Sequence, residues 1–158
     1  MSSVIMNSWS EQQAALDQLF ALAERELAIY DRNLERFKFD DPARITMLTR
    51  LLTGDPNARL RIAVRDARHF RNHSPRLVAL LRDHGHHMMV QETPDNLAHL
   101  RDSMILADDH HALVVFDQDQ PRCKLILDDP AATRPYLRRF DDLWQEGGTP
   151  VSPSVLGL

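Results

Sequence analysis

The stretch RDSMILADDHHALVVFD, residues 101–117, contains two apolar runs that are separated by one short polar segment. The runs cover 103–107 and 112–116, and Asp108 to His111 lie between them. Two strand-like runs this close together are typical of a β-hairpin, whose strands are antiparallel. A third run, 122–127, follows after a short turn and predicts one more strand beside the hairpin.

Before this hairpin, helical and extended patterns alternate along the chain. Short apolar or alternating runs predict strands at 27–31, 58–66 and 87–91. Helical apolar spacing, with signals such as Asp41-Pro42 at a helix start, predicts helices at 11–26, 42–54 and 75–85. Strands that alternate with helices favour a parallel sheet built with right-handed crossovers.

The two halves together predict one α/β domain with a mixed β-sheet, in which a parallel βαβαβ half is followed by antiparallel strands and flanked by helices. A last helix follows Asp129-Pro130 and ends before Gly147. We expect a single domain over 10–148, a flexible leader over 1–9 and a flexible tail over 149–158.

Composition narrows the class of protein further. The chain has 158 residues, of which 43% are hydrophobic and 27% charged, which is typical of one globular domain. Apolar runs are too short for a membrane span, and the first residues lack the pattern of a signal peptide. One cysteine, Cys123, allows no intrachain disulfide, and the net charge is −4. We therefore expect a cytoplasmic protein that binds neither membrane nor nucleic acid.

The order of elements, with a last helix that ends Phe140-Asp-Asp-Leu-Trp144, resembles one phospholipase D-type domain. In active members of that family the matching strand reads H-x-K-x4-D. The resemblance implies that this His attacks phosphorus, that the Lys holds phosphate oxygens, and that a second copy of the motif supplies the acid. Set on this pattern, the His, Lys and Asp positions fall at Arg101, Ser103 and Asp108, so only the aspartate matches. The chain is also similar to small uncharacterised bacterial domains of that fold.

The degenerate motif has a direct chemical consequence. Arginine stays protonated at any working pH, so Arg101 cannot attack phosphorus. The residues two positions before the only lysines, Lys38 and Lys124, are Arg36 and Arg122, so the sequence contains no H-x-K. We expect no phospholipase D chemistry, no catalytic residue in this motif and no cofactor.

Several of the charged residues should meet at one edge of the sheet. Asp31 and Arg65-Asp66 follow parallel strands, and Arg101 leads into an antiparallel neighbour, so all four are predicted at the edge where ligand crevices lie in α/β sheets. The candidate residues for binding a ligand or an anion are Arg101, Ser103, Asp108, Arg65, Asp66 and Asp31. Either Arg101 binds an anion, with Ser103 and Arg65 beside it, or it pairs with Asp31, Asp66 or Asp108 and has a structural role.

Histidines gather in two groups, which are His84, His86 and His87, and His110 and His111. The first group lies at a predicted helix end and the second in a predicted turn, where polar residues are common, so we expect no metal site. Two functions remain open. The first is a non-enzymatic phospholipase D-like domain that binds a partner protein or a small anionic ligand. The alternative is a hydrolase or transferase that uses the crevice carboxylates with a histidine or a metal.

The resemblance also predicts how the chain assembles. Members of the family with a single motif look like half of a two-lobed unit and pair across the sheet edge that carries the motif. We therefore expect a two-fold homodimer, since an uncovered sheet edge would also expose apolar surface.

Overall fold

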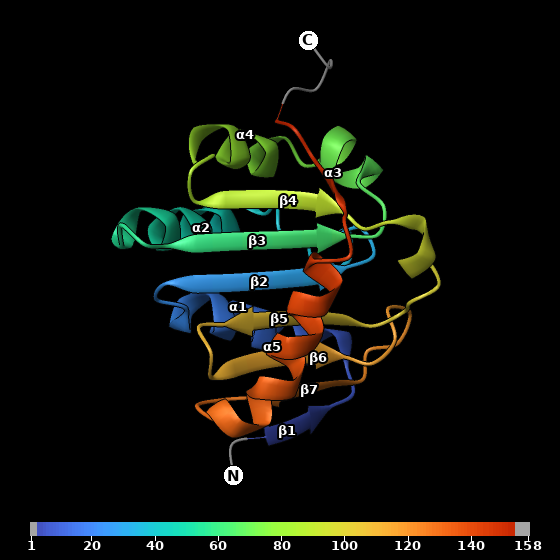
Figure 1. The fold of residues 1–158 in the computed structure, drawn as a ribbon. Coiled ribbons are helices and arrows are strands. Elements are labelled where there is room, and N and C mark those ends of the chain that lie inside the picture. Colours follow the sequence, from blue (N-terminus) through green and yellow to red (C-terminus); the bar gives the residue numbers. More distant parts are fainter. Residues whose placement is uncertain (1–2, 154–158) are drawn as a thin grey trace.

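The computed structural model describes residues 3–153, whose strands form one mixed sheet flanked by helices (Figure 1). The strands in that range are β1 (Ser3–Met6), β2 (Glu26–Asp31), β3 (Arg59–Val64), β4 (Met88–Glu92), β5 (Ser103–Ala107), β6 (His111–Val115), β7 (Cys123–Ile126) and β8 (Thr149–Pro150). Their order across the sheet is β1-β7-β6-β5-β2-β3-β4-β8. The predicted α/β fold class is confirmed.

Strand β2 is the point at which the sheet changes direction. It pairs in parallel with β3, which pairs in parallel with β4, and it pairs antiparallel with β5. Strands β5, β6 and β7 are antiparallel to one another, as the hairpin spacing predicted. Because β5 runs against β2, its first residue, Ser103, lies at the same edge as the last residue of β2, Asp31. This edge carries the candidate site.

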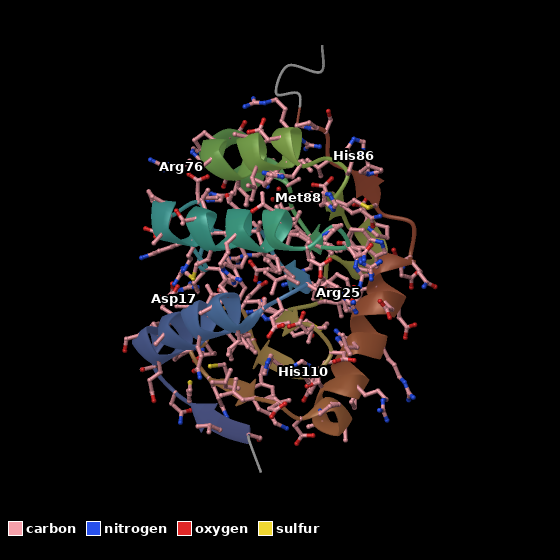
Figure 2. All side chains as sticks on the ribbon, turned by 90° about the vertical axis from the view of Figure 1, so that its left-hand side faces the viewer. Asp17, Arg25, Arg76, His86, Met88 and His110 are labelled. Atoms are coloured by element: carbon pink, nitrogen blue, oxygen red, sulfur yellow. The ribbon has the colours of Figure 1, made fainter. Side chains whose placement is uncertain are left out.

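Helices cover both faces of the sheet. They are α1 (Trp9–Leu22), α2 (Pro42–Gly54), α3 (Arg68–His73), α4 (Pro75–Asp83) and α5 (Pro130–Trp144), with a 3-10 turn η1 (Asp95–Leu97). Figures 1 and 2 show α1, α2 and α4 on one face and α5 crossing the other. The buried residues accordingly form two clusters, a large one on the side of α1, α2 and α4 and a smaller one under α5.

Local sequence signals explain where the long helices begin. Ser8 accepts a hydrogen bond from Glu11 N (3.1 Å) at the start of α1. Asp41 and Asp129 cap α2 and α5 in the same way, and a proline follows each at the first helical position. These caps satisfy backbone N–H groups that have no partner inside the helix. The short helix α3 has no side-chain cap, which is why its sequence gave no start signal.

Both ends of the chain differ from the prediction. In the leader expected over 1–9, residues 3–6 form edge strand β1, which pairs with β7. In the tail expected over 149–158, β8 pairs with β4, Val151 is buried, and Val151 N donates to Val90 O (2.8 Å). Each segment gains backbone partners only from strands far away in the sequence, so local patterns gave no signal. Residues 1–2 and 154–158 lie outside the described residues.

Two smaller expectations concern burial and membranes. Cys123 is fully buried in β7, as the strand pattern predicted, and burial raises the pKa of its thiol. Over residues 3–153, the helices lack the length and apolar character needed to cross a membrane.

Candidate functional site

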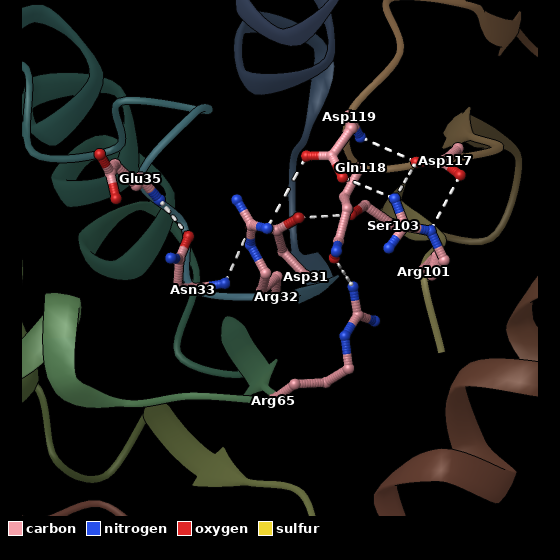
Figure 3. Close-up of polar contacts among 10 residues, drawn as sticks. All are labelled: Asp31, Arg32, Asn33, Glu35, Arg65, Arg101, Ser103, Asp117, Gln118 and Asp119. Atoms are coloured by element: carbon pink, nitrogen blue, oxygen red, sulfur yellow. Dashed lines mark hydrogen bonds and ion pairs between the residues drawn. The ribbon is translucent and has the colours of Figure 1, made fainter. Parts of the chain in front are cut away.

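A cluster of polar side chains lies at the carboxyl edge of β2 and β3, where the segment leading into β5 and the turn after β6 also arrive. We call this cluster, which consists of Asp31, Arg65, Arg101, Ser103 and the turn residues 117–119, the crevice, because ligand crevices of α/β sheets lie at this edge. Figure 3 shows that these side chains point toward one another. The sequence-based expectation that Asp31, Arg65 and Arg101 gather at one edge agrees with this arrangement.

Ser103 and Asp31 form the floor of the crevice. The Ser103 hydroxyl donates to Asp31 Oδ1, and both side chains are buried, with Asp31 only 5% exposed. The second carboxylate oxygen, Oδ2, accepts from Leu34 N (2.7 Å) and from Asn33 N (3.3 Å). Asp31 therefore fixes the chain after β2, and it leaves the Ser103 hydroxyl engaged with a carboxylate rather than free toward solvent.

Arg101 forms the outer wall and pairs with the turn after β6. Its Nε and Nη2 donate to the two oxygens of Asp117 (3.0 and 3.1 Å), and Nη2 also donates to Asp119 Oδ2 (2.5 Å). The Arg101 guanidinium holds the pKa of Asp117 below its usual value, and these carboxylates raise the pKa of Arg101. The Arg101 side chain remains 52% exposed. It is a paired surface cation.

The partners of Arg101 correct one prediction. We expected Asp31, Asp66 or Asp108, whereas the partners are Asp117 and Asp119. The reason is the hairpin register, which pairs Ser103 with Val115 and so brings Arg101 opposite Asp117. The backbone agrees, since Gln118 N donates to Arg101 O (2.6 Å).

Arg65 links the crevice to α5. Its Nη1 donates to Asp102 O (2.9 Å) and its Nη2 to Gln118 Oε1 (2.7 Å), while its guanidinium carbon lies 4.9 Å from the centre of the Tyr30 ring. Arg139 of α5 makes two hydrogen bonds to the carboxylate of Asp102 (2.8 and 3.0 Å). Burial raises the pKa of Tyr30, whose hydroxyl finds no partner among residues 3–153. The result is a network of polar contacts beneath the crevice.

The other two candidate residues stand apart from this network. Asp66 follows β3 but pairs with the exposed Arg68 (2.6 Å), whose guanidinium lowers the pKa of Asp66. Asp108 lies at the opposite edge of the sheet, because the whole length of β5 separates it from Ser103. There it accepts backbone hydrogen bonds from residues 24, 25 and 26 (3.0–3.1 Å) and so fixes the start of β2. The structure does not bring Asp108 together with Arg101.

The histidine groups also lie away from the crevice. His84, His86 and His87 precede β4, while His110 precedes β6 and His111 is its first residue, so both groups lie at the edge that carries Asp108. His111 Nδ1 accepts from Asp128 N (3.0 Å), and His110 Nδ1 lies 3.0 Å from Asp109 Oδ1. In the described part of the chain, no three or more metal-ligating side chains come together. The hypothesis that a histidine acts together with the crevice carboxylates therefore gains no geometric support.

Sequence reasoning missed five residues that shape the crevice, which are Asp102, Asp117, Gln118, Asp119 and Arg139. A signal existed for the turn residues, because continuing the predicted hairpin beyond its strands brings residue 117 beside residue 101. No comparable signal existed for Arg139, since its contact with Asp102 depends on how α5 packs on the sheet.

Solved structures with the same arrangement of elements define the class of the fold. Nuc from Salmonella typhimurium, described as a phospholipase D family member, matches with a TM-score of 0.60 at 15% identity over 96% of this chain and 98% of Nuc. NucT from Helicobacter pylori matches with a TM-score of 0.60 at 12% identity, over 94% of this chain and 98% of NucT. The chain therefore has a phospholipase D-like fold, as the resemblance in sequence implied.

A family model described as "Domain of unknown function (DUF7931)" matches residues 8–152, and the chain belongs to that family. No curated protein sequence matches this chain. A further fold neighbour is TrmBL2, described as an archaeal chromatin protein with a novel mode of DNA binding, with a TM-score of 0.69 at 10% identity. The chain covers 54% of TrmBL2, so it corresponds to about half of that protein.

Proposed function

We propose that this chain is a non-catalytic phospholipase D-like interaction domain, two copies of which pair across the crevice edge. One observation supports the non-catalytic part of the proposal. Both residues at the reactive motif positions are engaged with carboxylates of the same chain, Arg101 with Asp117 and Asp119, and Ser103 with Asp31. Arg101 is a permanent cation and cannot attack phosphorus. The Ser103 hydroxyl is held by the buried Asp31 carboxylate, and with only 1% of Ser103 exposed it is not presented to a substrate.

The pairing of Arg101 also supports an interaction role over a small-anion site at this place. A guanidinium that accepts a ligand anion has free donors directed into the pocket. Arg101 instead uses Nε and Nη2 on two carboxylates, and Arg65 uses Nη1 and Nη2 on Asp102 O and Gln118. An anion could use these particular donors only by displacing the contacts.

An apolar side chain beside the crevice supports pairing with a second copy. Phe116 directly follows β6, is 46% exposed, and has the guanidinium carbon of Arg122 5.7 Å from its ring centre. Exposed aromatic and arginine side chains are enriched at protein interfaces. The neighbouring Arg101, Asp117 and Asp119 carry both signs of charge, which is the pattern that a two-fold contact needs to complement itself.

The phospholipase D reading is tested by hydrolysis of bis-p-nitrophenyl phosphate. The purified chain should give no turnover above the uncatalysed rate, since the nucleophile and the phosphate-holding lysine are both missing. Turnover that survives Arg101→Ala but is lost on a single histidine substitution would reject the non-catalytic assignment and favour the hydrolase alternative. The net charge of −4 argues against a nucleic-acid partner, and a DNA titration tests that part separately.

A further inference from the structure

Next to the crevice, the loop between β2 and α2 borders a depression that has no part in the function proposed above. It has a volume of about 290 Å³ and is lined by Arg32, Glu35, Arg36 and Lys38. A smaller depression of about 140 Å³ adjoins it and shares Arg36 and Lys38, with Trp9 and Gln13 as its other walls. We call the two together the basic depression.

The cations of the basic depression are held on a rigid support. Buried side chains alternate with exposed ones along this loop, so that Phe37 and Phe39 enter the core while Arg36 and Lys38 face outward. The rings of Phe20 and Phe39 stack at 5.3 Å. The loop is therefore anchored on both sides of Lys38 and immediately after Arg36.

Polar contacts from the two neighbouring helices fix the same loop. Gln13 Nε2 of α1 donates to Arg36 O (3.1 Å). The nearly buried Arg44 of α2 donates to Phe37 O and, through Nε, to Asp17 Oδ1 (2.8 Å). Lys38 has a φ of 54°, a left-handed conformation that a side-chain-bearing residue keeps only where its surroundings hold it. The position of Lys38 is thus set before any ligand arrives.

Two cations in the basic depression have no anionic partner. Within residues 3–153, the Lys38 ammonium makes no hydrogen bond or ion pair, and the Arg36 guanidinium lies over the Trp9 ring at 4.2 Å without a carboxylate. The carboxylate of Glu35 is 3.7 Å from His69 Nδ1. This arrangement contrasts with the crevice, where Arg101 is paired with Asp117 and Asp119 and Arg65 donates to Asp102 O and Gln118 Oε1.

We propose that the basic depression binds the phosphate group of a small phosphorylated molecule through Arg36 and Lys38. A planar guanidinium and a mobile ammonium suit a tetrahedral anion that carries two charges. The surface beyond Lys38 is lined by Asp17, Asp41 and Arg44. Because Asp17 is paired with Arg44, the carboxylate of Asp41 is the one that would repel the next phosphate of a polynucleotide. The site thus favours a single phosphate over a nucleic-acid strand. This inference is independent of the proposed pairing at the crevice.

Calorimetric titration with inorganic phosphate, at an ionic strength matched with sodium chloride, tests the proposal. Lys38→Gln and Arg36→Gln should each weaken binding about tenfold, which corresponds to one lost charge-assisted contact. Lys124→Gln and Arg134→Gln are matched controls, because they remove the same charges elsewhere, and Arg134 is an exposed residue of α5 away from both the crevice and the basic depression. Both controls should bind like the unchanged chain, and circular dichroism should show all four variants folded.

Four outcomes would overturn the proposal. The unchanged chain could give no binding heat, or the controls could weaken binding as much as the tested variants. Arg101→Ala could abolish phosphate binding, which would move the anion site to the crevice. Titrations with a hexose monophosphate and with a single-stranded oligonucleotide separate the sources of the phosphate. Much tighter, steeply salt-dependent binding of the oligonucleotide would overturn the assignment to a small molecule.

Discussion

The crevice and the basic depression are neighbours on the same edge of the molecule, but their cations are arranged in opposite ways. In the crevice, Arg101 and Arg65 are engaged by carboxylate, amide and carbonyl oxygens of the chain itself. In the basic depression, Arg36 and Lys38 are held by their backbones and leave their charged groups without an anion. The segment after Asp31 connects the two, as Figure 3 shows for Arg32 and Asn33.

This difference in how the cations are paired supports the role that we propose for each region. Charges that neutralise one another inside the chain order a surface, and they contribute to stability and to complementary contacts with another protein. Unpaired charges on a backbone that is held in place offer a ligand contacts without first breaking others. An ordered, internally paired surface at Arg101 and Ser103 is therefore compatible with the anion site that we propose a short distance away.

The largest effect should come from the crevice floor. Replacing Asp31 with alanine leaves Leu34 N, Asn33 N and the Ser103 hydroxyl without their acceptor in a buried place. We expect a loss of about 3 kcal/mol in the free energy of unfolding, measured by urea denaturation. Asp66→Ala, at the same edge but paired on the surface with Arg68, should cost less than about 1 kcal/mol. Equal losses in the two variants would show that the buried Asp31 contributes no more to stability than the surface-paired Asp66.

A smaller loss is expected from the crevice wall. Arg101→Ala removes two ion pairs that water and salt partly screen, because the side chain is half exposed. The unfolding midpoint should fall, but by less than in Asp31→Ala. The loss should shrink further in about 1 M salt, where the Debye length is only about 3 Å. A loss that salt leaves unchanged would mean that packing, and not charge, is the role of Arg101.

The pH dependence of stability should also report the pairing of Arg101 with Asp117. The pKa of Asp117 is lowered in the folded chain, chiefly by its hydrogen bonds from Arg101. Its stabilisation is therefore present above the unfolded value of about 3.9 and is lost as the pH falls through the lower folded value. Thermal melts between about pH 5 and pH 2, which span the unfolded pKa of aspartate, should show this loss. In Arg101→Ala the acid-induced decrease should be smaller. An unchanged decrease would assign it to other carboxylates.

The smallest effect on stability should come from the basic depression. Lys38→Gln removes a cation that has no partner in residues 3–153, so the free energy of unfolding should change by less than about 0.5 kcal/mol. Lys124→Gln is the matched comparison and should behave alike in the same urea titration. A clear destabilisation by Lys38→Gln alone would show that Lys38 supports the loop rather than a ligand.

Much of the fold could be predicted because its signals are local. Proline after a capping aspartate marked α2 and α5, alternation marked β3, and the short polar segment at Asp108 marked the hairpin. Strands β1 and β8 were missed because each is short and depends on pairing with a distant strand, β7 or β4. Pairing energy of this kind leaves no local pattern.

The site was predictable in position and less so in its contacts. The carboxyl-edge rule placed Asp31, Arg65 and Arg101 together, because strand direction decides where strands end. It gave no partner for Arg101, which depends on the exact hairpin register. Asp108 became a candidate through the family motif, and it lies at the other end of β5. The basic depression was not foreseen at all, since Arg36 and Lys38 meet Trp9 and Gln13 only through the packing of α1 on the loop.

The central claim, that the crevice edge serves contact between copies of the chain, is tested most directly by light scattering at micromolar concentration. The unchanged chain should give twice the 18.2 kDa of one chain. Phe116→Glu, beside the crevice, should return the mass of a single chain. Met89→Glu, which changes a similarly exposed apolar residue of β4 (49% against 46%), should stay at the double mass. A single-chain mass for the unchanged protein, or equal loss of pairing in both variants, would contradict the claim.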